Sequence, residues 1–110
     1  MPHIVLFVKY PSHIASEVAK KALNSIQKNL FPDDESIQEI LVQSAGRLTE
    51  DGIRNLSVTL VKAGKLEEAL SSIAKEMAYF SEIEGFESTY EVWATYQEGF
   101  KAFGMELPQV

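Results

Sequence analysis

The sequence predicts an α+β fold in which the order strand–helix–strand occurs twice. Two nine-residue segments, 20–28 and 67–75, are identical at five positions, and each follows a β-branched run that ends in Val-Lys. A weaker echo follows each segment, Glu-Ile-Leu-Val at 39–42 and Glu-Val-Trp-Ala at 91–94. An internal repeat constrains architecture more than any single residue does. At 110 residues we expect one domain over 1–110, with a core at 3–97 and a C-terminal tail at 98–110.

The first half predicts a strand, a helix and a second strand. Residues 3–9 are apolar at both odd and even positions, which is typical of a strand covered on both faces. Ser12 is a candidate cap for a helix that runs to about Leu30, where the segment 31–35, with its proline, ends it. The apolar positions of this helix fall at helical spacing and comprise Val18, Ala19, Ala22, Ile26 and Leu30. The second strand covers 37–45.

The second half repeats the pattern after a turn at 48–52. Gly52 is free to adopt a positive φ there, so the second strand and a third strand at 53–62 form a hairpin. The second helix covers 65–81, and the fourth strand covers 86–97. The stripe of the second helix comprises Leu66, Ala69, Leu70, Ile73, Met77 and Phe80. With right-handed crossovers, the sheet is antiparallel and has the first and third strands at its centre.

Alternation along the strands predicts one covered face and one open face. The even positions are nearly all apolar, Val42, Leu56, Val58 and Leu60 among them, and we expect them under both helices. The odd positions mix large apolar groups with polar ones, and no element of the chain remains to cover them. The expected open face comprises His3, Val5, Phe7 and Lys9; Glu39, Leu41 and Gln43; Ile53, Asn55, Ser57, Thr59 and Val61; and Glu91, Trp93, Thr95 and Gln97.

An apolar patch of this kind predicts a partner, because monomers rarely leave large contiguous apolar patches bare. The simplest cover is a second copy of the same sheet, related by a two-fold axis. The polar groups of the face then enclose a cavity, and we expect a small apolar or aromatic molecule to bind in it.

The element order is that of the ferredoxin-like βαββαβ arrangement, and over residues 3–97 the chain resembles the dimeric α+β barrel superfamily. The resemblance rests on element order, length, the polar-lined open face and local runs such as Gly-Lys-Leu-Glu-Glu-Ala-Leu at 64–70. The superfamily includes cofactor-independent monooxygenases, lactone isomerases, haem-degrading enzymes and ligand-sensing domains. It implies a homodimer paired through the open sheet faces. No branch-specific signature is present, so no catalytic residue is carried over.

Two histidines are candidate general bases. His3 lies on the expected open face, and His13 lies at the strand-to-helix turn; imidazole has a suitable intrinsic pKa for proton transfer. For both residues, the commoner alternative is an exposed and inert side chain.

The remaining candidates line the open face as ligand or interface groups. Phe7 and Trp93 are aromatic anchors of the kind that concentrate at interfaces. Glu39 and Glu91 hold equivalent places in the two halves. They either form a carboxylate pair in which each raises the pKa of the other, or they prevent edge-to-edge association of the sheet. These candidates are Phe7, Lys9, Glu39, Leu41, Glu91 and Trp93. Lys9, like Arg54 and Lys62, is a basic group near the sheet, and it either neutralises an anionic ligand or extends into solvent.

Composition argues against several classes of function. The net charge is −6 and the ten basic residues are dispersed, which disfavours binding of nucleic acid or of a membrane surface. The chain has no cysteine, no phosphate-binding glycine motif and no apolar run of membrane-spanning length. His3 with the two glutamates matches no metal-ligand spacing. We expect a cytoplasmic protein with no cofactor and no metal.

The leading hypothesis is a homodimer that binds a small molecule between its sheets. One alternative is a cofactor-independent monooxygenase or isomerase that acts on an aromatic or polyketide-like substrate, with His3 or His13 as base and Trp93 lining the site. The other alternative is a structural or regulatory dimerisation module with a filled interface. The residues leave the presence of catalysis open.

Overall fold

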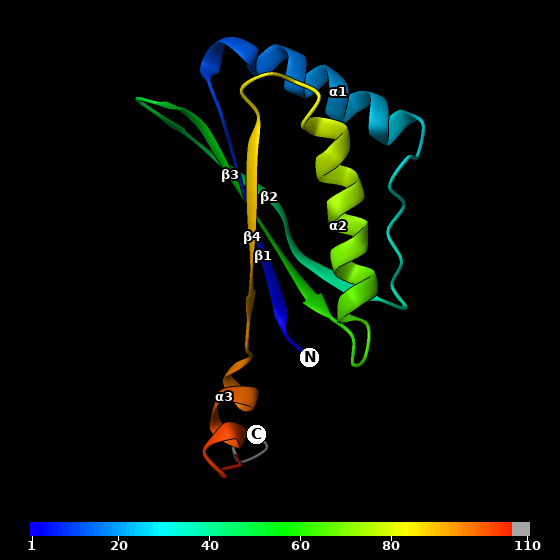
Figure 1. Cartoon of the computed structure of the whole chain (residues 1–110), viewed down its shortest axis with the longest axis vertical. Helices are drawn as coiled ribbons and strands as arrows, with labels where there is room; N and C mark the ends of the chain where they lie inside the picture. The colour runs from blue at the N-terminus through cyan, green and yellow to red at the C-terminus, as the bar shows by residue number, and fades with distance from the viewer. Residues whose placement is uncertain (107–110) are drawn as a thin grey trace.

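The computed structural model describes residues 1–106 as a four-stranded antiparallel sheet with two helices on one of its sides (Figure 1). The strands are β1 (His3–Tyr10), β2 (Gln38–Thr49), β3 (Gly52–Val61) and β4 (Glu87–Trp93). The helices are α1 (Ala15–Gln27), α2 (Leu66–Phe80) and α3 (Tyr96–Ala102). The strand order β2-β3-β1-β4 places β1 and β3 at the centre, as the sequence predicts. The α+β class is therefore confirmed, and the architecture is compatible with a ferredoxin-like fold.

The main core lies between the central strands and α2. Ile4 of β1 and Val61 of β3 are almost completely buried, and they pack with Ala69 and Ile73 of α2. The side chains at these two helical positions lie on one face of α2, which confirms the stripe predicted for this helix. Burial of this apolar surface is the main stabilising term for the domain.

A second cluster joins α1 to the end of α2. Ile14 and Val18 pack against Phe80 and Ile83, and the ring of Phe80 stacks on that of Phe86, with their centroids 5.4 Å apart. Figure 1 shows α1 crossing the end of α2 rather than lying along the sheet. Within α1, only Val18 is fully buried.

This placement corrects the prediction for α1. Val18 is buried, but Ile26, on the same predicted stripe, is 72% exposed, because the C-terminal half of the helix extends past α2. The helix also ends earlier than predicted, at Gln27, where Asn29 adopts a positive φ and the amide of Leu30 donates to the carbonyl of Ser25. At the other end, Ser12 caps nothing and instead begins a 3-10 turn that covers Ser12–Ile14.

The fourth strand ends at Trp93, four residues before the predicted boundary. Thr95 starts α3 instead: its hydroxyl accepts from the amide of Glu98, and the Glu98 carboxylate accepts from the amide of Thr95. This reciprocal capping box satisfies two amides that would otherwise lack partners at the helix start. Thr95 and Gln97 therefore do not belong to the sheet. Of the predicted tail, residues 107–110 lie outside the described residues.

The chain has more surface than a compact monomer of its size. The Cα radius of gyration is 16.0 Å, against about 13 Å for a compact domain of this length. The accessible surface is 7940 Å², against about 6,100 Å² for a monomer of 12.3 kDa. Within residues 1–106, no helix has the length and the apolar run that a bilayer crossing requires.

Gly52, at the end of the β2–β3 turn, is the residue at which the backbone tolerates no side chain. Its φ is +131°, and a Cβ atom there would lie 2.3 Å from the carbonyl oxygen of Tyr10. Both the left-handed conformation and the close approach of β1 therefore require glycine, in agreement with the prediction.

We predict that Gly52→Ala lowers the free energy of unfolding by roughly 2–4 kcal/mol, because the added methyl group forces two backbones apart at a disfavoured φ. Gly99→Ala is the matched control, because nothing lies within 4 Å of a Cβ at that position in α3. Thermal and urea unfolding of both variants measure the difference. Equal midpoints for Gly52→Ala and the native chain would contradict this account of the turn.

Candidate functional site

The face of the sheet opposite α1 and α2 is the candidate site, and the strand pairing defines its residues. Residues that oppose each other in an antiparallel pair point to the same face. Because β1 contributes His3, Val5, Phe7 and Lys9 to this face, their partners across the sheet lie there as well. We call this surface the open face. It consists of four rows: Arg47, Arg54, Lys9 and Glu87; Ala45, Leu56, Phe7 and Thr89; Val42, Val58, Val5 and Glu91; and Glu39, Leu60, His3 and Trp93.

The pairing corrects the predicted face of β3. Phe7 opposes Leu56 and Val5 opposes Val58, so the even residues of β3 share a face with the odd residues of β1. Val61, predicted on the open face, packs beneath α2. Ile53, Asn55, Ser57 and Thr59 likewise lie on the helix side. On β3, the open face therefore carries leucine and valine side chains in place of the predicted polar ones, and it is more apolar than predicted.

Two bulges change the face of β2 part-way along the strand. Ile40 opposes Thr59 but Val42 opposes Val58, so Leu41 has no partner residue on β3. A second irregularity follows between Val42 and Ala45. A bulge adds a residue to one strand and reverses the alternation beyond it. Val42 therefore joins the open face, contrary to the prediction.

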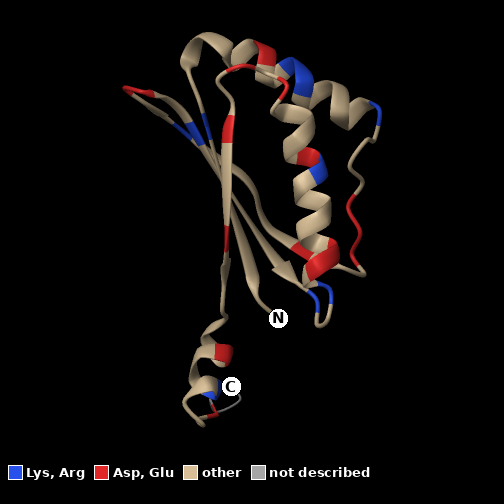
Figure 2. Ribbon diagram, viewed as in Figure 1, with Lys and Arg blue, Asp and Glu red and all other residues tan. Residues whose placement is uncertain are grey.

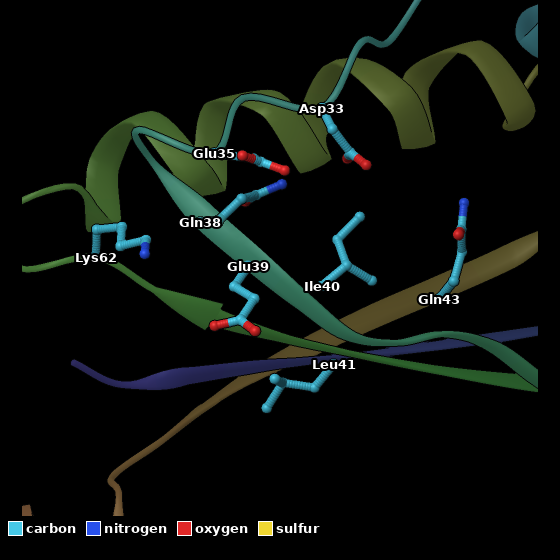
Figure 3. A pocket seen from close by; sticks show the side chains of 8 residues that line it. All are labelled: Asp33, Glu35, Gln38, Glu39, Ile40, Leu41, Gln43 and Lys62. Atoms are coloured by element: carbon cyan, nitrogen blue, oxygen red, sulfur yellow. The ribbon is translucent and has the colours of Figure 1, made fainter.

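Figure 3 shows the start of β2, where the prediction holds for two candidate residues. Glu39 and Leu41 point away from α2, whereas Ile40 points toward it. Gln43, predicted on the open face, points to the side of α2 because it follows the first bulge. Glu39 and Leu41 also line a groove of about 530 Å³ at this edge of the sheet, between β2 and the loop that follows α1.

The edge groove is mainly acidic. Asp33 and Glu35 lie in the loop on the side of α2, whereas Glu39 points away from α2 (Figure 3). Lys62 supplies one positive charge at the end of the groove. Within residues 1–106, no group of three or more His, Asp or Glu side chains is arranged to hold a metal ion. The groove therefore forms a polar rim beside the open face.

The centre of the open face is apolar and only partly covered by its own neighbours. Val5 is 4% exposed, whereas Phe7 is 37% and Trp93 52% exposed. Across the sheet, a row of three valines separates the row of Leu56 and Phe7 from the row of Leu60 and Trp93. These short side chains lie between two rows of longer ones, and we call this row the valine trough: Val42, Val58 and Val5.

Polar contacts fix the groups at the β4 edge of the open face. The indole nitrogen of Trp93 donates to a carboxylate oxygen of Glu91 at 2.8 Å, which orients the ring beside the trough. The ammonium group of Lys9 lies 3.3 Å from the carboxylate of Glu87. Both interactions are exposed, so each contributes little to stability, but each sets the direction of a side chain on the face.

The structure separates the two candidate bases. His3 lies on the open face between Leu60 and Trp93 and is half-buried. His13 is exposed in the 3-10 turn beyond the opposite end of β1, about 23 Å away along a strand of this length. Of the two, only His3 can act together with Trp93 on this face.

Comparison of the chain with protein-family models, with curated proteins and with solved structures finds no match. The function must therefore follow from the chain's own geometry.

Of the eight candidate residues, six lie on the open face by strand pairing: His3, Phe7, Lys9, Glu39, Glu91 and Trp93. Leu41 joins them at the bulge, and His13 does not. Sequence reasoning missed Arg47, Leu56 and Val58, because no local signal fixes the pairing of β3 with its neighbours.

Glu76 of α2 offers a pH-dependent test of the loop that borders the groove. Burial, and secondarily the negative charge of Asp33 in that loop, raise the pKa of the Glu76 carboxyl. A carboxyl with a raised pKa is harder to ionise in the folded chain than in the unfolded chain. At a pH above the pKa of the carboxyl in the folded chain, the ionised Glu76 therefore lowers the free energy of unfolding. This loss of stability disappears as the pH falls below the pKa of the carboxyl in the unfolded chain.

We predict that Glu76→Gln raises the free energy of unfolding at pH 7 and that the gain shrinks as the pH falls toward 4. Glu84→Gln, at an exposed position, is the control and should change stability little at either pH. Urea unfolding followed at several pH values measures both. A gain for Glu76→Gln that does not vary with pH would contradict the proposed burial and charge effects.

Proposed function

We propose that the protein is a homodimer of the dimeric α+β barrel type, in which two open faces pair and enclose a site for a small, partly apolar molecule. The observation that carries the proposal is the apolar centre of the open face, which no element within residues 1–106 covers. Two sheets packed face to face lie about 10 Å apart, so their inner side chains meet and exclude water.

The surplus surface of the chain supports a partner of this size. The excess over a compact monomer is about 1,800 Å², and each partner in a standard interface buries about 800 Å². An interface of this size corresponds to somewhat less than half of the excess. Exposed apolar groups elsewhere, such as Ile26 of α1 and Leu48 near the hairpin, account for another part.

The valine trough favours a bound molecule over a fully filled interface. Phe7 and Trp93 stand on either side of it and approach the partner sheet first, so the shorter valines leave space between the two copies. Pockets that bind small molecules combine an apolar lining with a few polar groups. Here Glu91 and His3 supply the polar groups at the β4 side of the trough.

We predict that Phe7→Asp combined with Trp93→Asp converts the dimer into a monomer, because two carboxylates would be buried without partners at the centre of the interface. The matched control is Leu23→Asp with Ile26→Asp, which changes two exposed apolar residues of α1 and should leave the dimer intact. Light scattering gives the mass in solution, and circular dichroism checks that each variant is folded. A native chain that is monomeric at micromolar concentration would refute the proposal.

A second prediction concerns the trough itself. Val58→Phe fills it, so we expect the affinity for the neutral apolar dye Nile red to fall about tenfold, which corresponds to about 1.4 kcal/mol. Val92→Phe is the control, since Val92 lies on the helix side of the sheet. Fluorescence titration of both variants measures the affinities. Equal affinities would show that the dye does not bind in the trough.

A further inference from the structure

Three cations lie side by side on the open face. Arg47 opposes Arg54, and Arg54 opposes Lys9, so their side chains form one row across β2, β3 and β1. Figure 2 shows Lys and Arg positions close together on neighbouring strands, near the acidic tip of the β2–β3 hairpin. The chain has only ten basic residues and a net charge of −6. Three of these ten basic residues therefore lie in a single row, although their positive charges repel one another.

The two arginines have no anionic partner in the described part of the chain. Lys9 pairs with Glu87, but neither Arg47 nor Arg54 makes an ion pair or a side-chain hydrogen bond within residues 1–106. Like charges directly opposite each other on neighbouring strands are destabilising. An anion bound between them would turn this repulsion into attraction, and a guanidinium group matches the two oxygens of a carboxylate.

The surface beside this row is apolar. The next row contains Leu56 and Phe7, and the valine trough follows it. From the arginines to the trough is four residues along a strand, or about 13 Å. A hollow of about 850 Å³ has Phe7, Lys9 and Arg54 in its lining, together with Glu87, Glu91 and residues of the helix side such as Phe86. Its lining includes neither Arg47 nor the three valines, so the strand pairing is what places positive charge next to apolar surface on the open face.

We propose that Arg47 and Arg54 bind the head group of an amphipathic carboxylate whose apolar body lies across Phe7 and into the valine trough. The inference rests on the proposed function only in that the partner sheet supplies the second wall of the site. One carboxylate fits, because Glu87 already neutralises Lys9 and the two free guanidinium groups match its two oxygens. The length of the path suits a chain of about ten carbon atoms.

The test is calorimetric titration of the native protein with decanoate, below its micelle-forming concentration, and with 1-decanol. We expect decanoate to bind at least tenfold more tightly than the alcohol. The double variant Arg47→Gln/Arg54→Gln should lose this preference and keep its affinity for 1-decanol. The control, Lys20→Gln/Lys28→Gln, removes the same charge from exposed positions of the segment 15–28 and should bind decanoate as the native protein does.

Light scattering of the same samples separates this inference from the proposed dimer. If the native chain is monomeric, the dimer proposal fails, and a decanoate preference that depends on the arginines still supports the inference. Equal binding of decanoate and 1-decanol would overturn it. If the arginine variant becomes monomeric and Glu39→Gln/Glu91→Gln does the same, the arginines pair with carboxylates of a second copy, which would also overturn it.

Discussion

The register between β1 and β3 is the constraint on which the rest of the structure depends. It places Ile4 opposite Thr59 and Val5 opposite Val58, and it thereby decides which side chains meet α2 and which remain on the open face. A shift by one residue would exchange the two sets, because side chains alternate with a period of two. Burial of Val61 against Ala69 and Ile73 holds this register, since a slip would expose Val61 and bury Leu60 in its place. The composition of the open face is therefore a consequence of the core.

The same register explains why one side of the sheet is left uncovered within the described chain. One sheet with helices on one side has a second side to cover, and here that side carries leucine, valine and aromatic residues rather than a polar set. The α1 helix does not cover this side, because it crosses the end of α2 and packs on Phe80 and Ile83. The uncovered side contributes to the large accessible surface, whereas the large radius of gyration also reflects α3, which projects beyond the sheet (Figure 1). A second copy offers a surface of matching chemistry without any further element.

Most of the architecture could be predicted from the sequence, because periodicity and the internal repeat are local signals. The strands, the α2 stripe and the role of Gly52 all follow from residues close together in the chain. The face of β3 could not be predicted, because alternation shows that two faces differ but not how one strand aligns with its neighbour. The bulges of β2 carried no glycine or proline signal near Leu41. The capping box of Thr95 and Glu98 was readable from its spacing, but the apolar residues before it favoured a longer strand. The arginine row was missed for the same reason as Leu56 and Val58.

The most direct test of the account is a search for contacts between copies. Protein labelled with ¹³C at its methyl groups is mixed with unlabelled protein, so that dimers containing one chain of each kind form. Isotope-filtered nuclear Overhauser spectra of this sample then report only contacts between the two chains. Pairing of the open faces predicts signals from the methyl groups of Leu56 and Val58 to the rings of Phe7 and Trp93 of the other copy. Signals confined to the α1 residues Leu23 and Ile26, or no signals between chains at all, would contradict the central claim.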